Sequence, residues 1–192
     1  MPDGMPPPAR SRPARNRVLN LANAVTFARL CAVPAIVWLV LHDDDAAAFW
    51  LFLAAGLSDA LDGWLARRAG PTPVGAMLDP AADKLLLVAL YVTLAAERVL
   101  PDWLAILVVF RDILIVGGVA VLRLTGQAVA IHPSRLSKAN TLLQIVGGGA
   151  ALAEAASGWP GPAVLTVLVW GVAASTLASG AAYVWAVGAH GR

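Results

Sequence analysis

The sequence predicts an all-α integral membrane protein with six transmembrane helices in one bundle and both chain termini in the cytoplasm. Of its 192 residues, 59% are hydrophobic and only 14% are charged, whereas a soluble domain carries roughly a quarter charged residues. Six apolar stretches each approach or exceed the roughly 20 residues that a helix needs to cross a bilayer. The composition therefore excludes an ordinary soluble domain, and the net charge of +2 gives no reason to expect a nucleic-acid partner.

The six expected spans are separated by short segments rich in proline, glycine and charge, as loops are. These segments leave no room for a soluble domain. We therefore expect a disordered basic tail over residues 1–19, followed by one transmembrane domain over residues 20–192. The spans are Asn23–Leu41, Ala46–Ala66, Met77–Ala96, Pro101–Leu122, Ala139–Ala156 and Pro162–Val187.

The orientation follows from the lysines and arginines, which cytoplasmic loops carry in excess. With six spans, nearly all of them fall on the side that holds both termini, and the opposite side has only Arg98 among several acidic residues. That distribution predicts a multi-pass protein of the cell inner (cytoplasmic) membrane with its site facing the cytoplasm. The residues on the cytoplasmic side include Arg10, Arg12, Arg15, Arg17, Arg67, Arg68, Arg123, Arg135 and Lys138.

Four aspartates lie within one short segment of this hydrophobic sequence. Asp59 and Asp62 lie three residues apart near the cytoplasmic end of the second span, so that they share one helix face. Asp79 and Asp83 lie four residues apart at the start of the third span and share a face in the same way. We expect two carboxylate pairs at similar depth on neighbouring antiparallel helices. Each isolated aspartate there would cost about 2.5–3.5 kcal/mol, which calls for a compensating partner.

Shared divalent cations would offset the repulsion among Asp59, Asp62, Asp79 and Asp83. Carboxylates without a nearby histidine or cysteine are ligands for Mg²⁺, Mn²⁺ or Ca²⁺ and not for zinc. A metal–carboxylate site of this kind normally binds phosphate oxygens and neutralises charge during phosphoryl chemistry. Gly63 allows close backbone approach, and Arg67 lies one turn further on, where it suits a phosphate.

Three other interpretations stay open at this level. The aspartates could be helix-end charges paired with arginines near headgroups, which would explain one or two of them. Intramembrane carboxylates also mark ion pathways, as in a small ion-coupled membrane transporter. A structural membrane subunit, finally, would tolerate replacement of all four.

The pattern Asp59-x-x-Asp62-Gly63-x-x-Ala66-Arg67, followed by Gly75-x-x-x-Asp79-x-x-x-Asp83, resembles the signature of the CDP-alcohol phosphatidyltransferase family. Residues 20–29 (NLANAVTFAR) resemble the opening helix of that family. Residues 110–116 (FRDILIV) and 134–144 (SRLSKANTLLQ) resemble its fourth and fifth helices. Only the N-terminal tail and the last span lack a recognisable match.

The resemblance implies a phospholipid-biosynthesis enzyme that transfers a phosphatidyl group from CDP-diacylglycerol to an alcohol and releases CMP. It implies that Asp59, Asp62 and Asp79 are metal ligands, and that Asp83 contacts the metal and is the base for the incoming hydroxyl. It also implies a pair of divalent ions, Mg²⁺ or Mn²⁺, and a homodimer. The residues expected to hold the CDP-lipid are Asn23, Thr26, Gly63, Arg67 and Thr72.

The acceptor alcohol is the least defined part of this expectation. Arg111, Arg135 and Lys138 are cations on the same side that could bind an anionic acceptor, although ordinary topology or headgroup contact would also explain Arg135. Arg111-Asp112 and the SKANT sequence at 137–141 are more similar to the cardiolipin synthases of this family than to its phosphatidylglycerophosphate synthases. We therefore expect phosphatidylglycerol as acceptor, giving cardiolipin, with glycerol 3-phosphate, giving phosphatidylglycerophosphate, as the alternative.

Overall fold

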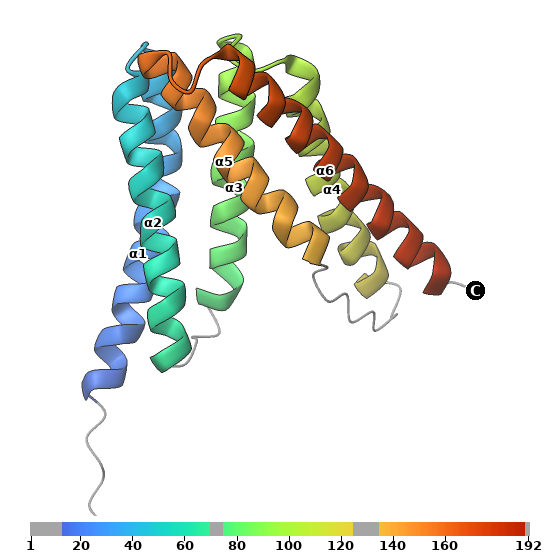
Figure 1. Ribbon diagram of the computed structural model, residues 1–192. Coiled ribbons are helices and arrows are strands. Elements are labelled where there is room, and N and C mark those ends of the chain that lie inside the picture. The colour runs from blue at the N-terminus through green and yellow to red at the C-terminus, as the bar shows by residue number, and fades with distance from the viewer. Residues whose placement is uncertain (1–12, 70–74, 125–134, 191–192) are drawn as a thin grey trace, which may run out of the picture.

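The computed structural model describes the backbone of residues 13–69, 75–124 and 135–190, and the side chains of residues 27–58, 82–122, 124 and 135–188. All regular structure in these ranges is α-helical, as predicted, and a helix covers each of the expected spans (Figure 1). The helices are α1 (Pro13–Val40), α2 (Asp45–Ala69), α3 (Gly75–Ala96), α4 (Asp102–Leu124), α5 (Arg135–Ser157) and α6 (Pro162–His190).

The largest difference from the expected boundaries is at the start of α1. This helix begins at Pro13 rather than near Asn23 and so extends into the segment expected to be a disordered tail. Proline is favoured in the first turn of a helix because its missing N–H has no partner there in any case. The division into a tail of residues 1–19 and a domain of residues 20–192 stays a prediction.

Two helical stretches with described side chains are long and apolar enough to cross a membrane, Asp102–Leu122 in α4 and Pro162–Gly188 in α6. Shorter apolar stretches, Phe27–Val40 and Asp45–Ser58, occupy the described parts of α1 and α2. A membrane protein accounts for these stretches, while the number of crossings and the side on which the termini lie stay predictions.

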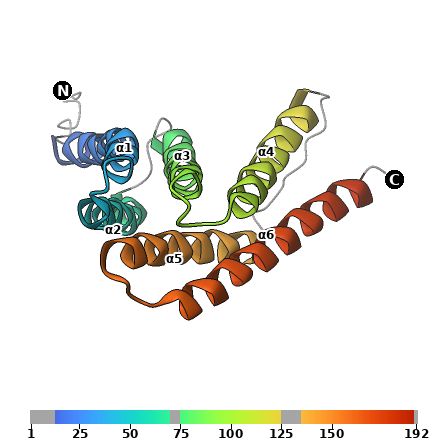
Figure 2. The ribbon, with the colours of Figure 1, turned by 90° about the horizontal axis from the view of Figure 1, so that it is seen from above.

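The helices form two groups of four that share the pair α3 and α5. In the first group α1 and α5 each pack against both α2 and α3; in the second, α4 packs against α3 and α6, and α6 packs against α5. Seen from above, α1 and α2 lie on one side, α3 and α5 in the middle, and α4 and α6 on the other side (Figure 2). The consecutive helices α2 and α3 run antiparallel and lie diagonally across the first group (Figures 1 and 2); over the described ranges they make no contact with each other, so they are not the direct neighbours that we expected.

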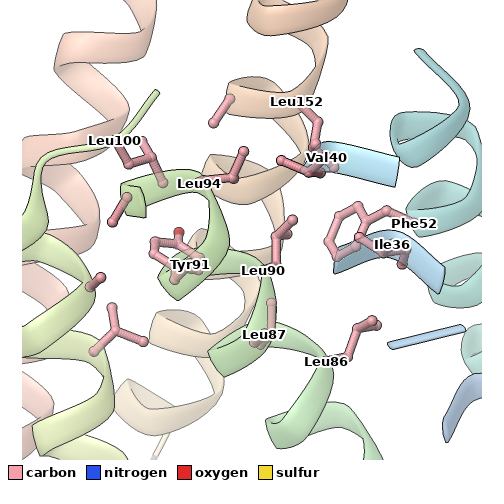
Figure 3. Close-up of a cluster of buried hydrophobic side chains, with 14 of the residues drawn as sticks. Ile36, Val40, Phe52, Leu86, Leu87, Leu90, Tyr91, Leu94, Leu100 and Leu152 are labelled. Carbon is pink, nitrogen blue, oxygen red and sulfur yellow. The ribbon is translucent and has the colours of Figure 1, made fainter. Parts of the chain in front are cut away.

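The apolar core lies towards the end of the bundle where the α1–α2, α3–α4 and α5–α6 turns converge (Figure 1). Ile36, Leu90 and Leu94 are each at most 1% exposed, and Figure 3 shows Leu90 and Leu94 of α3 beside Ile36 and Val40 of α1 and Leu152 of α5. Towards the opposite end the helices diverge, and the buried side chains described there include the polar Arg29, Arg111 and Asp112. The apolar end therefore holds the bundle together and leaves the other end for a site.

Glycines of α5 let the central helices approach closely. A Cβ atom on Gly148 would lie 2.8 Å from Leu90 Cδ2, and one on Gly147 would lie 3.0 Å from the hydroxyl of Tyr91. Tyr91 also donates a hydrogen bond of 2.9 Å to the carbonyl oxygen of Gln144. The glycine run of α5 consequently packs inside the bundle, where it brings α3 and α5 together.

Candidate active site

The predicted metal carboxylates lie on the ends of α2 and α3 that diverge from the turn end. Asp59 and Asp62 belong to the last part of α2, and Asp79 and Asp83 to the first part of α3. Because α1 and α5 each pack against both helices, the two carboxylate pairs lie across one four-helix group. Of the four, only Asp83 has a described side chain. The convergence of all four carboxylates stays a prediction.

Asp83 forms an ion pair with a buried arginine of α1. Arg29 Nη1 donates to Asp83 Oδ1 at 2.8 Å, and the side chains are 3% and 39% exposed respectively. Sequence reasoning did not include Arg29 among the site residues. The signal was present, because a cation in the apolar part of a membrane helix needs a buried partner. The pair ties the predicted base to α1.

Arg111 of α4 is buried at the centre of a second polar cluster, in the other four-helix group. It is 4% exposed. Its Nη1 donates to Asp112 Oδ1 at 2.7 Å, and its Nη2 donates to Ser137 Oγ of α5 at 2.7 Å and to Ser179 Oγ of α6 at 2.6 Å. Three helices thus fix one guanidinium group. Its Nε is buried without a hydrogen-bond partner among the described residues.

A third ion pair links these two clusters. Lys84 Nζ of α3 lies 3.2 Å from Asp112 Oδ1, the same carboxylate oxygen that accepts from Arg111. Asp112 is 7% exposed as a residue, so this carboxylate is buried between two cations. Lys84 follows Asp83 directly in the chain. The described site is therefore a series of charged groups from α1 through α3 to α4, and serines of α5 and α6 bind its last member, Arg111.

The seam between α5 and α6 continues this polar layer by one turn. Asn140 is fully buried, and its Oδ1 accepts hydrogen bonds from Ser175 Oγ at 2.7 Å and Thr176 Oγ1 at 2.9 Å. Ser137 precedes Asn140 by three residues, and Ser179 follows Thr176 by three, so both serines lie one helical turn from this cluster. Polar contacts of this kind hold membrane helices together.

The other predicted site residues are only partly described. Arg135 and Lys138 are exposed in the first turn of α5, on either side of Ser137. Asn23, Thr26, Gly63 and Arg67 lie on the described backbone of α1 and α2, but their side chains are outside the described residues. Thr72 lies outside them altogether.

An apolar hollow lies between α3 and α4 beside the Lys84–Asp112 pair. It has a volume of about 510 Å³, and Gly117 and the apolar side chains of both helices complete its lining. A second hollow of about 540 Å³ adjoins it at Val109 and Ile113 and continues towards the turn end. From Lys84 to Ala96, the α3 residues lining the two hollows span about 18 Å at about 1.5 Å per residue. This is slightly more than half the ~30 Å hydrocarbon thickness of a bilayer.

The residues present fit a divalent metal site in their chemistry. The donor set is all carboxylate, as Mg²⁺ and Mn²⁺ prefer. Asp83 is 39% exposed, so one predicted ligand is accessible to an ion. The described side chains alone contain no cluster of three potential ligands. The site therefore depends on Asp59, Asp62 and Asp79, whose side chains are not described.

Comparison with known proteins gives consistent matches. The family model for CDP-alcohol phosphatidyltransferase matches residues 19–179. The chain is 34% identical over 188 residues to the cardiolipin synthase (CMP-forming) / mitochondrial hydrolase fusion protein of Schizosaccharomyces pombe, covering 90% of this chain and 32% of that protein. It is 36% identical over 188 residues to the chloroplastic CDP-diacylglycerol–glycerol-3-phosphate 3-phosphatidyltransferase 1 of Oryza sativa, covering 88% and 57%.

A bacterial relative matches more of its own length. The CDP-diacylglycerol–glycerol-3-phosphate 3-phosphatidyltransferase of Bacillus subtilis is 32% identical over 151 residues, covering 70% of this chain and 77% of that protein. The chain spans less than two thirds of the other two relatives. The family match nevertheless includes α2 and α3, which carry the four aspartates, and both helices of the seam at Arg111. The chain belongs to the CDP-alcohol phosphatidyltransferase family.

Proposed function

We propose that this protein transfers a phosphatidyl group from CDP-diacylglycerol to an alcohol and releases CMP. Its family membership carries this proposal, and the relatives named above are a cardiolipin synthase and two glycerol-3-phosphate phosphatidyltransferases. Membership also favours phosphatidyl transfer over the ion-coupled transporter that intramembrane carboxylates alone would allow.

The chemistry assigned to the chain begins at Asp83. Its carboxylate takes the proton of the acceptor hydroxyl while the hydroxyl oxygen bonds to the phosphatidyl phosphorus. The bond from that phosphorus to the CMP oxygen breaks, and CMP leaves with the electron pair. Arg29 keeps the carboxylate of Asp83 in place, since it holds one of the two carboxylate oxygens at 2.8 Å.

The CDP-lipid is assigned to the first four-helix group. Asp59, Asp62, Asp79 and Asp83 would hold two divalent cations, Mg²⁺ or Mn²⁺. Such ions, when bound, neutralise charge on the diphosphate and on the leaving CMP. The residues that we assign to the CDP moiety and diphosphate are Asn23, Thr26, Gly63, Arg67 and Thr72.

For the acceptor we propose phosphatidylglycerol, which gives cardiolipin, and we assign its phosphate to Arg111 with Arg135 and Lys138 nearby. Two features support this. The Nε–H of Arg111 is a buried donor without a partner in the described part of the chain. The apolar hollow lies between α3 and α4 beside the Lys84–Asp112 pair that contacts Arg111, outside the group to which we assign the CDP-lipid, so it suits an acyl chain of a lipid acceptor, which glycerol 3-phosphate lacks. The two glycerol-3-phosphate phosphatidyltransferases among the relatives favour the alternative acceptor.

The same proposal places the protein in a membrane with six crossings, both termini in the cytoplasm and the site at the cytoplasmic face. We assign it to the cell inner membrane. Mitochondrial and chloroplastic proteins are among the relatives, so this location needs its own test by fractionation. We also propose a homodimer, which mass measurement in detergent tests. Since Gly147 and Gly148 pack inside the bundle, they do not supply the dimer contact.

The deciding experiment is an acceptor panel on the purified protein in detergent with CDP-diacylglycerol and Mg²⁺ or Mn²⁺. Phosphatidylglycerol, glycerol 3-phosphate and inositol phosphate are offered separately, CMP release is measured, and the lipid product is identified by mass. We expect CMP and cardiolipin with phosphatidylglycerol. If only glycerol 3-phosphate supports CMP release and the product is phosphatidylglycerophosphate, glycerol 3-phosphate is the acceptor instead of phosphatidylglycerol. If no alcohol supports CMP release, the proposed transferase activity is refuted.

A further inference from the structure

We propose that Asp112 and Lys84 are positioning residues, which hold the guanidinium of Arg111 in a fixed position relative to the turn of α3 that carries Asp83. The inference rests on the proposed function, in which Asp83 accepts the proton and Arg111 binds the acceptor phosphate. It adds two residues to the reaction that act through Arg111 and do not touch the reacting atoms.

The contacts converge on one carboxylate oxygen. Asp112 Oδ1 accepts from Arg111 Nη1 at 2.7 Å and lies 3.2 Å from Lys84 Nζ. The side chains of Arg111 and Asp112 are 4% and 10% exposed, whereas that of Lys84 is 39% exposed. Arg111, Asp112 and Lys84 thus form a triad in which the buried carboxylate of Asp112 contacts both cations, and Lys84 connects this carboxylate to α3.

The direction of the two neighbouring side chains on α3 explains why this connection matters. Successive residues of a helix point about 100° apart, because a turn contains 3.6 residues. Asp83 reaches α1 through Arg29, and Lys84 reaches α4 through Asp112. One turn of α3 therefore links the group that holds the four aspartates to the group that holds Arg111. A shift of that turn relative to α4 would change the separation of the proton acceptor from the acceptor phosphate.

The charges of the triad support a role in anion binding. Arg111 and Lys84 each carry +1 and Asp112 carries −1, so the triad has a net charge of +1 at neutral pH. One anionic group of a ligand would balance it. A buried ion network that served only stability could be replaced by apolar side chains without loss. The excess positive charge distinguishes this triad from such a neutral network.

The opposite side of the guanidinium is fixed by α5 and α6. Ser137 and Ser179 both accept from Nη2, at 2.7 and 2.6 Å. These serines hold Arg111 against one pair of helices, and Asp112 with Lys84 holds it against α3. Loss of Lys84 should therefore leave Arg111 bound to α5 and α6 but free to move relative to Asp83.

The test is a double-mutant cycle on the full-length protein, with Asp112→Asn, Lys84→Met and the double variant. Misplacement of a reacting group by about 1 Å can cost on the order of 100-fold in rate. We expect about a 10- to 100-fold loss of acceptor-dependent kcat/KM in Asp112→Asn and a smaller loss in Lys84→Met. The double variant should resemble Asp112→Asn, because Lys84 acts only through that carboxylate. The KM for CDP-diacylglycerol should stay within about twofold of wild type.

Two controls separate this role from a general loss of structure. Asp102→Asn removes an exposed carboxylate at the other end of α4 and should leave the rates unchanged. Lys84→Arg keeps the charge and the reach and should restore most of the rate. If Asp112→Asn does not fold, Lys84→Met and Lys84→Arg carry the test. A Lys84→Met protein with wild-type acceptor kinetics, or equal losses for both substrates, would overturn the positioning role. Wild-type protein that releases no CMP would remove the proposed function and this inference together.

Discussion

Replacement of Arg29 by methionine tests whether the ion pair at Asp83 serves the reaction. Methionine keeps much of the length and the apolar body of the side chain and removes the guanidinium that lies 2.8 Å from Asp83 Oδ1. If the pair holds the carboxylate where it accepts the proton, its loss should lower kcat and leave the KM for CDP-diacylglycerol largely unchanged.

The exposure of the two partners sets the expected size of the effect. Breaking a fully buried ion pair costs about 3–5 kcal/mol. Here the side chain of Arg29 is 3% exposed but that of Asp83 is 39% exposed, so water takes over part of the interaction. A hydrogen bond to a charged group, at about 1.5–3 kcal/mol, is the closer comparison. If the whole loss is felt in the transition state, it corresponds to roughly a 10- to 150-fold decrease in kcat.

The assay is CMP release at saturating CDP-diacylglycerol, acceptor and Mg²⁺. Arg29→Lys keeps the charge but lacks the planar guanidinium, and it should fall between methionine and wild type. Arg98→Met is the matched control, because it removes an exposed arginine from the turn at the opposite end of the bundle. An Arg29→Met protein whose kcat stays within about twofold of wild type would show that the pair has no part in turnover.

Four further predictions concern the site, the acceptor, the packing and pH. Asp83→Asn should keep CDP-lipid binding, measured by equilibrium titration, and lower turnover by about 100-fold or more; near-normal turnover would exclude Asp83 as the base. Gly117→Leu fills open space in the α3–α4 hollow and should lower the rate with phosphatidylglycerol about tenfold, while its rate with glycerol 3-phosphate should not change. The control variant Gly171→Leu, which also adds its side chain in open space, should keep the wild-type rate with both acceptors. Slowing with both acceptors would argue against an acyl chain there, and a loss of dimer would assign the hollow to a second copy of the chain. Gly148→Ala should lower the free energy of unfolding by about 1–3 kcal/mol in detergent, whereas Gly171→Ala, with nothing near its added methyl, should raise it slightly; equal effects would mean that α5 is not tightly packed. Burial, and then the neighbouring carboxylates of the turns, raise the pKa of Asp45. The folded state therefore holds this proton more tightly than the unfolded state, and the stability should fall as the pH rises through that pKa. The melting temperature of Asp45→Asn should fall less over this pH range than that of wild type, and an equal fall in both proteins would contradict the prediction.

Much of the fold could be predicted because helix formation in this chain depends on local information. Span length and the proline and glycine of the turns placed five of the six helix starts within a few residues of their observed positions. The start of α1 differs from the expectation because the proline and arginine content of the N-terminal segment favoured a disordered tail over residues 1–19, whereas the helix already begins at Pro13. The diagonal placement of α2 and α3 could not be predicted, since it depends on how α1 and α5 pack between them.

Those site residues could be predicted from the sequence whose charge makes their placement in an apolar helix energetically unfavourable. Arg111 and the aspartates stand out because a charge in an apolar helix must find a partner. The identity of each partner was not predictable, because it depends on which helices face each other. Arg29 with Asp83, and Lys84 with Asp112, join residues that are far apart in the sequence and become adjacent only through α1–α3 and α3–α4 packing.

The separation of an apolar end from a polar end explains how such a bundle can hold a reaction centre. Ile36, Leu90 and Leu94 hold the helices together near the turns, and the apolar core of the described residues lies at that end. Buried ions at the diverging ends give little net stability, since apolar side chains of similar volume would serve as well or better. The chain nevertheless places Arg29, Arg111 and Asp112 there, each less than 10% exposed. Both four-helix groups contain such energetically unfavourable buried charges, and α3 connects them. A reaction that needs both groups at once best accounts for this arrangement.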